Sequence, residues 1–319
     1  METSQWGDFV KGVSARVDEI IDETKDLAPS FMTSGLYKRE DSDGQIFRTQ
    51  GVVGLGLLEI VEEGESIKSD RTYPAYQTEY VMKMTAKSIE FSQMLAKTRP
   101  AELEAKLDEV RQVRIAANRT LNTWAWQVLI DGFGTTDSKF PIARLQDDVA
   151  MFSASHPSKV DGVAVRSNLV SGNPVLSESS LFTAIKQIKE QLNGRGLPIS
   201  PEGKFVLVVP TALEKTGMQI TDSELVSDSA ENAINYYKGK VDMIETNLIG
   251  ASAGGSDTAW YVFFKDEAMN SMRYVPLIEP KIEQEKDFDT KTLKVSIDFT
   301  CAFGYSNFEM SAGSTGLAS

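Results

Sequence analysis

Hydrophobic positions between Pro100 and Gly132 recur every three or four residues, which is the spacing of one face of an α-helix. Pro100 suits the first turn of a helix and Gly132 suits its C-terminal cap. About thirty residues at about 1.5 Å each make a rod of roughly 45 Å, far longer than an average helix. The sequence therefore predicts a long helix that supports other elements. Its apolar stripe consists of Leu103, Leu107, Val110, Val113, Ala117, Leu121, Trp124 and Val128.

Two further elements are predicted before this helix. Residues 5–27 carry apolar positions at helical spacing and stop before Pro29, so we expect a short amphipathic N-terminal arm. From Ile46 to Met84, two extended runs flank a polar, turn-rich stretch at residues 64–71, which predicts a long β-hairpin. Because two strands alone are marginally stable in water, we expect the hairpin to pack on another surface.

After the long helix the pattern changes to mixed helix and strand. Ser177 is a suitable N-cap for an amphipathic helix that ends at Asn193-Gly194. The apolar run 204–210 is typical of a strand buried on both faces. Residues 292–305 alternate strictly between apolar and polar side chains, which predicts a strand with one buried face. Further helices are expected at 211–220 and 230–240, further strands at 241–249, 259–265 and 273–280, and a frayed tail at 310–319.

Composition restricts the chemistry. With 33 basic and 46 acidic residues the net charge is −13, so any contact with nucleic acid is expected to be weak. A single cysteine, Cys301, excludes an internal disulfide, and one histidine leaves little from which to build a zinc, copper or iron site. We therefore expect no cofactor and no metal. The N-terminus lacks a signal-peptide layout and no window reaches the ~20 apolar residues that a membrane span needs, so we expect a soluble, cytosol-made protein.

The sole histidine, His156, lies beside Ser153 and Ser155 in what we interpret as a loop. Catalysis would need a nucleophile within hydrogen-bond reach of the imidazole and a carboxylate to orient it. Adjacent residues in an extended loop rarely converge in that way, and the GxSxG motif is missing. We expect no catalytic residues. A serine hydrolase that uses Ser155 and His156 is the alternative from another functional class.

The order of these elements resembles the major capsid proteins of tailed bacteriophages, which have the Hong Kong 97 type fold. Three stretches are similar to phrases common in such capsids: GLG followed by EEGESI, MFSASHP followed by SNLVSGNPVLSESSL, and FVLVVPTALEKTGMQI. The resemblance covers roughly residues 30 to 310 and implies an α+β fold. Its expected parts are an N-terminal arm (1–35), an E-loop hairpin (45–90), a P-domain spine helix (98–134), a connector (135–175), an A domain (176–268), P-domain return strands (270–311) and a flexible tail (312–319).

The resemblance implies a structural protein, not an enzyme, whose pentamers and hexamers form an icosahedral shell around double-stranded DNA. Such a protein is expected in the virion, after assembly in the bacterial host cytoplasm and without a membrane. Its expected partners are other copies of the chain, a portal, decoration proteins and a scaffolding protein. Scaffolding is expected to be a separate protein because no long coiled segment precedes the hairpin. An encapsulin-like nanocompartment shell is the alternative of the same fold.

The hairpin and the off-stripe positions of the long helix are the expected assembly interface. Arg111 and Arg119 are expected to pair with neighbouring subunits, since cations are scarce in this chain. Trp124 is expected in the core and Trp126 at a subunit contact. The predicted interface residues are Gly64, Glu65, Lys68, Arg71, Tyr73, Tyr76, Arg111, Arg119 and Trp126.

Overall fold

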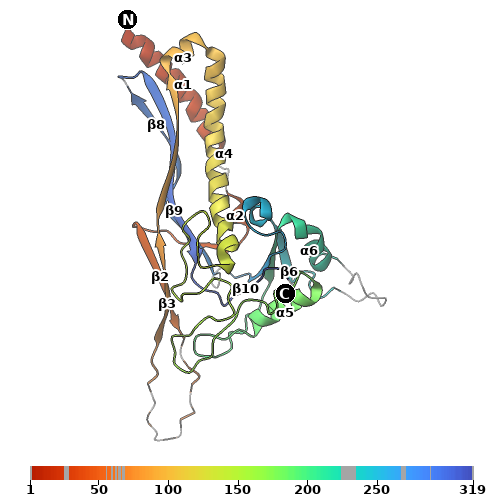
Figure 1. The fold of residues 1–319 in the computed structure, drawn as a ribbon. Helices are drawn as coiled ribbons and strands as arrows, with labels where there is room; N and C mark the ends of the chain where they lie inside the picture. The colour runs from red at the N-terminus through yellow and green to blue at the C-terminus, as the bar shows by residue number, and fades with distance from the viewer. Residues whose placement is uncertain are drawn as a thin grey trace.

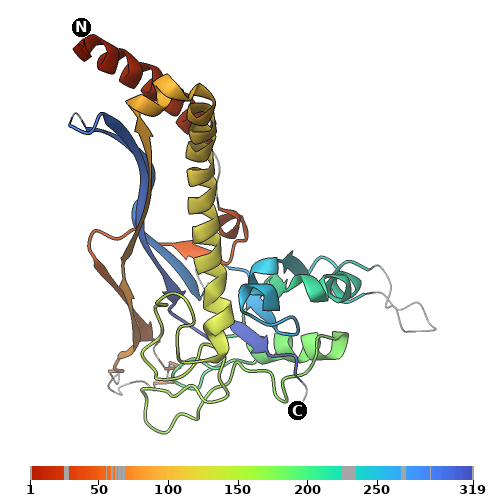
Figure 2. The ribbon, with the colours of Figure 1, turned by 45° about the horizontal axis from the view of Figure 1, so that its top comes forward.

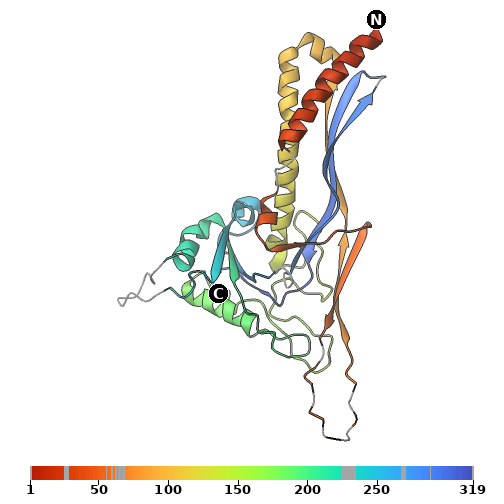
Figure 3. The same ribbon diagram turned by 180° about the vertical axis from the view of Figure 1, so that it is seen from behind.

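The computed structural model describes residues 2–24, 29–54, 56–58, 60–61, 63, 66, 69–223, 235–266, 271–287 and 289–317. The molecule is elongated, with helix α4 (Pro100–Ile130) running beside the two longest strands (Figure 1). A lobe of helices and strands lies to one side of the C-terminal end of α4, and a β-hairpin extends at the end of the molecule opposite the N-terminal helix (Figures 1 and 3).

The long helix predicted over Pro100–Gly132 is confirmed, and it continues into the 3₁₀ turn η1 (Asp131–Phe133). Its buried stripe packs on a four-stranded sheet in the order β1 (Tyr37–Arg39), β8 (Met272–Asp287), β9 (Thr292–Tyr305) and β4 (Lys83–Ser92). The apolar face of β9 is buried as its alternation predicts, because it lies between its neighbouring strands and under α4 (Figure 2).

The hairpin is shorter than predicted. Strand β2 (Ile46–Val53) pairs with β3 (Tyr73–Val81), but the next ten residues form β4 and pair with β9. The boundary 45–90 is therefore wrong at its C-terminal end. The physical reason is burial, since β4 brings Phe91 into the cluster under the start of α4.

The N-terminal arm is the helix α1 (Glu2–Thr24), and its apolar face is packed within the same chain. Val13, Val17 and Ile20 are buried against the cluster at the start of α4, so the arm is held there by its own subunit (Figure 3). The short helix α2 (Ser30–Thr33) precedes β1, and the short helix α3 (Gln93–Thr98) connects β4 to α4.

The lobe contains a second sheet in the order β10 (Ser311–Ser314), β7 (Trp260–Phe264), β5 (Phe205–Val209) and β6 (Val241–Glu245). Helix α5 (Glu178–Lys189) begins at the predicted N-cap Ser177, whose side chain forms a capping box with Ser180. The remaining elements are η2 (Thr211–Leu213), α6 (Glu214–Thr221), η3 (Asn247–Ile249) and η4 (Ala251–Ala253).

Two predictions for the lobe need comment. The frayed tail is wrong, because Ser311–Ser314 are buried and pair with β7. The predicted helix at 230–240 lies outside the described residues up to position 234, and residues 235–240 form turns. The connector predicted at 135–175 forms isolated bridges and turns. Among the described helices, none is both long enough and apolar enough to cross a membrane.

Candidate assembly surface

His156 is a buried structural residue. Its ring is fully buried, with Nδ1 2.7 Å from Asp147 Oδ2 and Nε2 3.1 Å from Asn168 Oδ1. The ring also stacks on Phe308, with centroids 3.6 Å apart. Because both ring nitrogens contact these oxygens, neither is placed to accept a proton from the Ser155 hydroxyl. The arrangement that a serine hydrolase needs is therefore not formed by Ser155 and His156. His156 lies in a loop, as expected, and its buried side chain anchors that loop in the core.

A second polar pair, with Arg166 buried and Glu309 partly buried, lies next to this histidine. Arg166 donates to the carboxylate of Glu309, and its guanidinium lies 4.8 Å from the Phe308 ring. Burial raises the pKa of Glu309, and the nearby Arg166 opposes that rise. The amide of Asn168 donates to Met151 O at 2.8 Å. Together these contacts bind the connector to the turn before β10, so this polar cluster serves the fold.

The half of the hairpin nearest the body is docked on its own subunit. Tyr80 is fully buried, and the Thr78 hydroxyl donates to Tyr305 O at 3.1 Å. The ladder changes register between Gln50 and Val52, at a β-bulge. The carbonyl of Ala75, at this bulge, accepts a hydrogen bond from the Gln50 side chain at 3.0 Å. Up to the bulge, the hairpin is therefore part of the body.

Beyond Val53 and Tyr73 the ladder ends, and the described residues between them form what we call the hairpin extension. Leu58 and Ile60 in this extension are 97% and 96% exposed, and Leu57 is also largely exposed. Clustered exposed leucine and isoleucine side chains mark protein contact sites more often than scattered ones do. The extension is therefore the strongest candidate for contact with another subunit.

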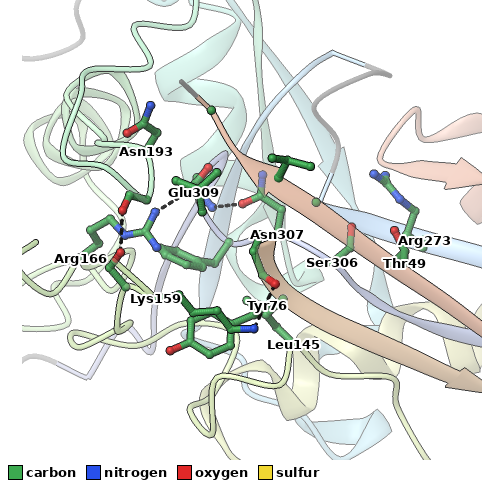
Figure 4. Close-up of a pocket in the computed structure, with 18 residues that line it drawn as sticks. Thr49, Tyr76, Leu145, Lys159, Arg166, Asn193, Arg273, Ser306, Asn307 and Glu309 are labelled. Atoms are coloured by element: carbon green, nitrogen blue, oxygen red, sulfur yellow. Dashed lines mark hydrogen bonds and ion pairs between the residues drawn. The ribbon is translucent and has the colours of Figure 1, made fainter. Parts of the chain in front are cut away.

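The predicted hairpin residues are only partly placed. Gly64, Glu65 and Lys68 lie outside the described residues. Arg71 in the extension and Tyr73 at the end of the ladder are exposed. Tyr76 is half-buried under Lys159, whose Nζ lies 4.7 Å from the ring centroid (Figure 4).

The predicted residues of the long helix differ in their surroundings. Arg111 pairs with Glu23 of α1 at 2.8 Å and with Asp108 at 3.1 Å. These two carboxylates of the same chain would compete with any carboxylate of a neighbouring subunit for Arg111. Arg119 is exposed. Trp126 is only 3% exposed and belongs to the main core, so its placement at a subunit contact is wrong.

The physical reason is that the C-terminal end of α4 is covered from several sides. The core cluster around it includes Phe299 of the first sheet and Tyr261 of the second. Trp124 is half-buried at the edge of this cluster, with its ring 4.8 Å from Phe140. The start of α4 is therefore buried along one apolar stripe, whereas its C-terminal end is buried on several sides.

The sequence did not identify the exposed apolar residues of the extension, or the arginine that contacts it, as interface residues. Leu57, Leu58 and Ile60 stand in the run GLGLLEI, whose glycines and lack of polar alternation are signals against a regular, half-buried strand. Arg195, which contacts the extension, carried no signal in its local sequence.

A cavity of about 260 Å³ lies between the base of the hairpin and the body (Figure 4). Its walls include Val53 and Tyr76 of the hairpin, Lys159 and Asn193 of two body loops, and Phe308. Among the described residues, no three His, Cys, Asp or Glu side chains are grouped as a metal site would require.

One family model matches most of the chain, and several solved structures share its fold. The model of the phage capsid protein family matches residues 83–309, which is more than two thirds of the chain. No curated protein matches the sequence. The fold is similar to a structure titled Mycobacterium phage Patience, with a TM-score of 0.56 and 12% identity over 99% of this chain and 88% of that chain.

Two further structures show the same fold. The capsid of Ralstonia phage GP4 has a TM-score of 0.54 and 12% identity over 88% of this chain and 87% of that chain. The capsid of Myoviridae phage XM1 has a TM-score of 0.52 and 11% identity over 91% of this chain and 92% of that chain.

Proposed function

The chain belongs to the phage capsid protein family and is a structural protein of an icosahedral virion shell, and we propose that its hairpin extension joins neighbouring subunits of that shell. The observation that carries this proposal is the exposure of Leu58 and Ile60 in a segment whose described residues belong to no strand. Covering an exposed pair of large apolar side chains with a partner lowers the free energy of the assembled state, because apolar surface is removed from water.

A second copy of the same chain is the partner that fits best. Capsid proteins self-associate, and symmetric assembly repeats each contact at every equivalent interface. A contact of modest affinity is then sufficient, because many copies close into one shell. We propose that these copies are arranged as pentamers and hexamers.

Other partners follow from the family. We propose a portal, a separate scaffolding protein and decoration proteins, with assembly in the host cytoplasm. Double-stranded DNA inside the shell would be contacted weakly and without sequence preference, since the chain has a net charge of −13. We propose no enzymatic activity. The family match favours a phage shell over an encapsulin-like compartment.

Electron microscopy of the purified recombinant chain, with light scattering, tests this function. We expect closed shells from the wild-type chain. Deletion of residues 64–69, the polar stretch between the two arms, should leave a folded, soluble subunit that forms few closed shells. Normal shells from the deletion variant would remove the hairpin from the assembly mechanism.

A further inference from the structure

A tight turn at Leu192–Pro198 contacts the hairpin where its ladder ends. An isolated bridge joins the two ends of this turn. The Asn193 side chain accepts hydrogen bonds from the backbone N–H of Arg195 at 2.8 Å and of Leu197 at 3.1 Å. Side-chain-to-backbone bonds of this kind fix the shape of a turn. The backbone that carries Arg195, at the tip of the turn, is thus held in one conformation.

The Arg195 guanidinium binds the return arm of the hairpin extension. Its Nη1 donates to both carboxylate oxygens of Asp70, at 3.0 and 2.9 Å, and its Nη2 donates to Oδ1 at 3.0 Å. Nη2 also donates to Arg71 O, and the guanidinium lies 5.4 Å from the Tyr73 ring centroid. The Arg195 side chain is 14% exposed and the Asp70 side chain 43% exposed, so the contact is shielded from water on the Arg195 side only.

Asp70 also holds the outgoing arm. The Gly56 backbone N–H donates to Asp70 Oδ2 at 2.8 Å. This hydrogen bond and the Arg195 guanidinium lower the pKa of Asp70, which shows that both stabilise its charged form. One carboxylate therefore connects the outgoing arm, the return arm and the body of the subunit.

Further contacts between described residues lie at the base of the hairpin. At Gly194 a Cβ would lie 3.0 Å from Val53, so the turn packs closely on the last residue of β2. Next to this contact, the 260 Å³ cavity separates the hairpin base from the body (Figure 4). Lys159 spans the gap by donating to Ala75 O at 3.2 Å. Polar contacts made by Arg195 and Lys159, together with the close packing of Val53 on the turn, thus hold the hairpin here.

From these contacts we propose that Arg195 is a positioning residue for assembly: it fixes the direction in which the hairpin extension leaves the subunit and so presents Leu58 and Ile60 to a second copy of the chain. This inference rests on the proposed role of the extension in joining subunits. Arg195 acts through Asp70 and does not itself need to touch the neighbour.

Spin-label distances in unassembled subunits measure that direction. Labels are attached to cysteines introduced as Leu58→Cys in the extension and Lys186→Cys on α5, where Lys186 is exposed. The native Cys301 should not react, because burial raises the pKa of its thiol to about 12. The distance distribution is recorded with Arg195, with Arg195→Ala and with Arg195→Lys, and shell formation by unlabelled chains is followed by light scattering.

We expect Arg195→Ala to broaden and shift the distance distribution and to slow shell formation. Arg195→Lys should fall between the two, because an ammonium group lacks the planar fork that binds Asp70 and Arg71 O together. Arg48→Ala is the matched control, since Arg48 pairs with Glu79 at 2.7 Å inside the ladder and should leave both measurements unchanged.

Two results would overturn the proposal. An unchanged distance distribution in Arg195→Ala would show that Arg195 does not fix the extension. A broadened distribution with wild-type shell formation would show that the fixed direction is irrelevant to assembly. Failure of the wild-type chain to form any shells would instead overturn the proposed function, and the distances would still decide whether Arg195 holds the extension.

Discussion

The long helix and the hairpin extension differ in whether their own subunit buries their apolar side chains. Along α4, residues such as Leu121 and Val110 are buried by the sheets and by α1 of the same chain. In the extension, Leu58 and Ile60 have almost no cover. The contrast indicates that the core of the subunit is complete within one chain, whereas the apolar side chains of the extension stay exposed until another molecule covers them. Substitutions in the two regions should therefore separate subunit stability from assembly.

The largest loss of subunit stability is expected from the buried histidine. His156→Ala leaves the Asp147 carboxylate buried without its imidazole partner, and breaking a buried pair in this way typically costs about 3 to 5 kcal/mol. Thermal melts of assembly-arrested subunits measure the loss. Ser155→Ala, at the exposed neighbouring position, is the control and should melt like the wild type. A wild-type melting temperature for His156→Ala would show that the buried network adds nothing to stability.

A comparable loss is expected from the helix core. Leu121→Ala removes a fully buried side chain, which typically costs about 2 to 5 kcal/mol. The matched control is Arg119→Ala on the exposed side of the same helix, where we expect a change within about 0.5 kcal/mol. Equal destabilisation by the two variants would mean that α4 is buried on every side along its middle as well as at its end.

A smaller effect is expected where α1 is fastened to α4. Arg111→Ala breaks the ion pair with Glu23, while the Arg16–Glu104 pair and the apolar contacts of α1 remain. We expect faster hydrogen exchange in the second half of α1, with only a slight change in melting temperature. Exchange in α1 that is identical for Arg111→Ala and Arg119→Ala would show that the ion pair does not fasten the helix.

The smallest effect on subunit stability is expected in the extension, where the effect on assembly is greatest. The double variant Leu58→Asp, Ile60→Asp replaces two exposed apolar groups, so the free energy of unfolding of the subunit should change by no more than about 0.5 kcal/mol per site. Shell formation, followed by light scattering, should be lost. Leu58→Met with Ile60→Val keeps the apolar character and should assemble. Assembly by the Asp variant would contradict the contrast between the two regions.

The sequence predicted elements with one apolar face, such as the start of α4 and β9, and also β5, whose continuous apolar run is buried on both faces. The stripe of α4 and the alternation of β9 were visible because each has one apolar face along most of its length. Trp126 was misplaced because the end of α4 lies between two sheets, where periodicity no longer distinguishes inside from outside. The pattern also could not show that β4 would leave β3 and pair with β9, since strand partners are set by tertiary packing.

Contacts between distant segments were beyond prediction. Ser311–Ser314 are small and lack large apolar side chains, yet they are buried because the strand completes a sheet, and a Cβ at Gly313 would lie 2.7 Å from Phe152. His156 is anchored by Asp147 and Asn168, which only the folding of the connector brings together. Arg195 meets Asp70 across 125 positions of sequence, so no local motif could have identified it.

The central claim is that a neighbouring copy covers the hairpin extension, and the accessibility of a thiol at position 58 tests it most directly. In a chain carrying Leu58→Cys, the native Cys301 is buried and should stay unlabelled in the folded subunit. The rate of thiol labelling is measured in unassembled subunits and in closed shells. We predict fast labelling in the subunits and strongly slowed labelling in the shells, and equal rates in the two states would contradict the account.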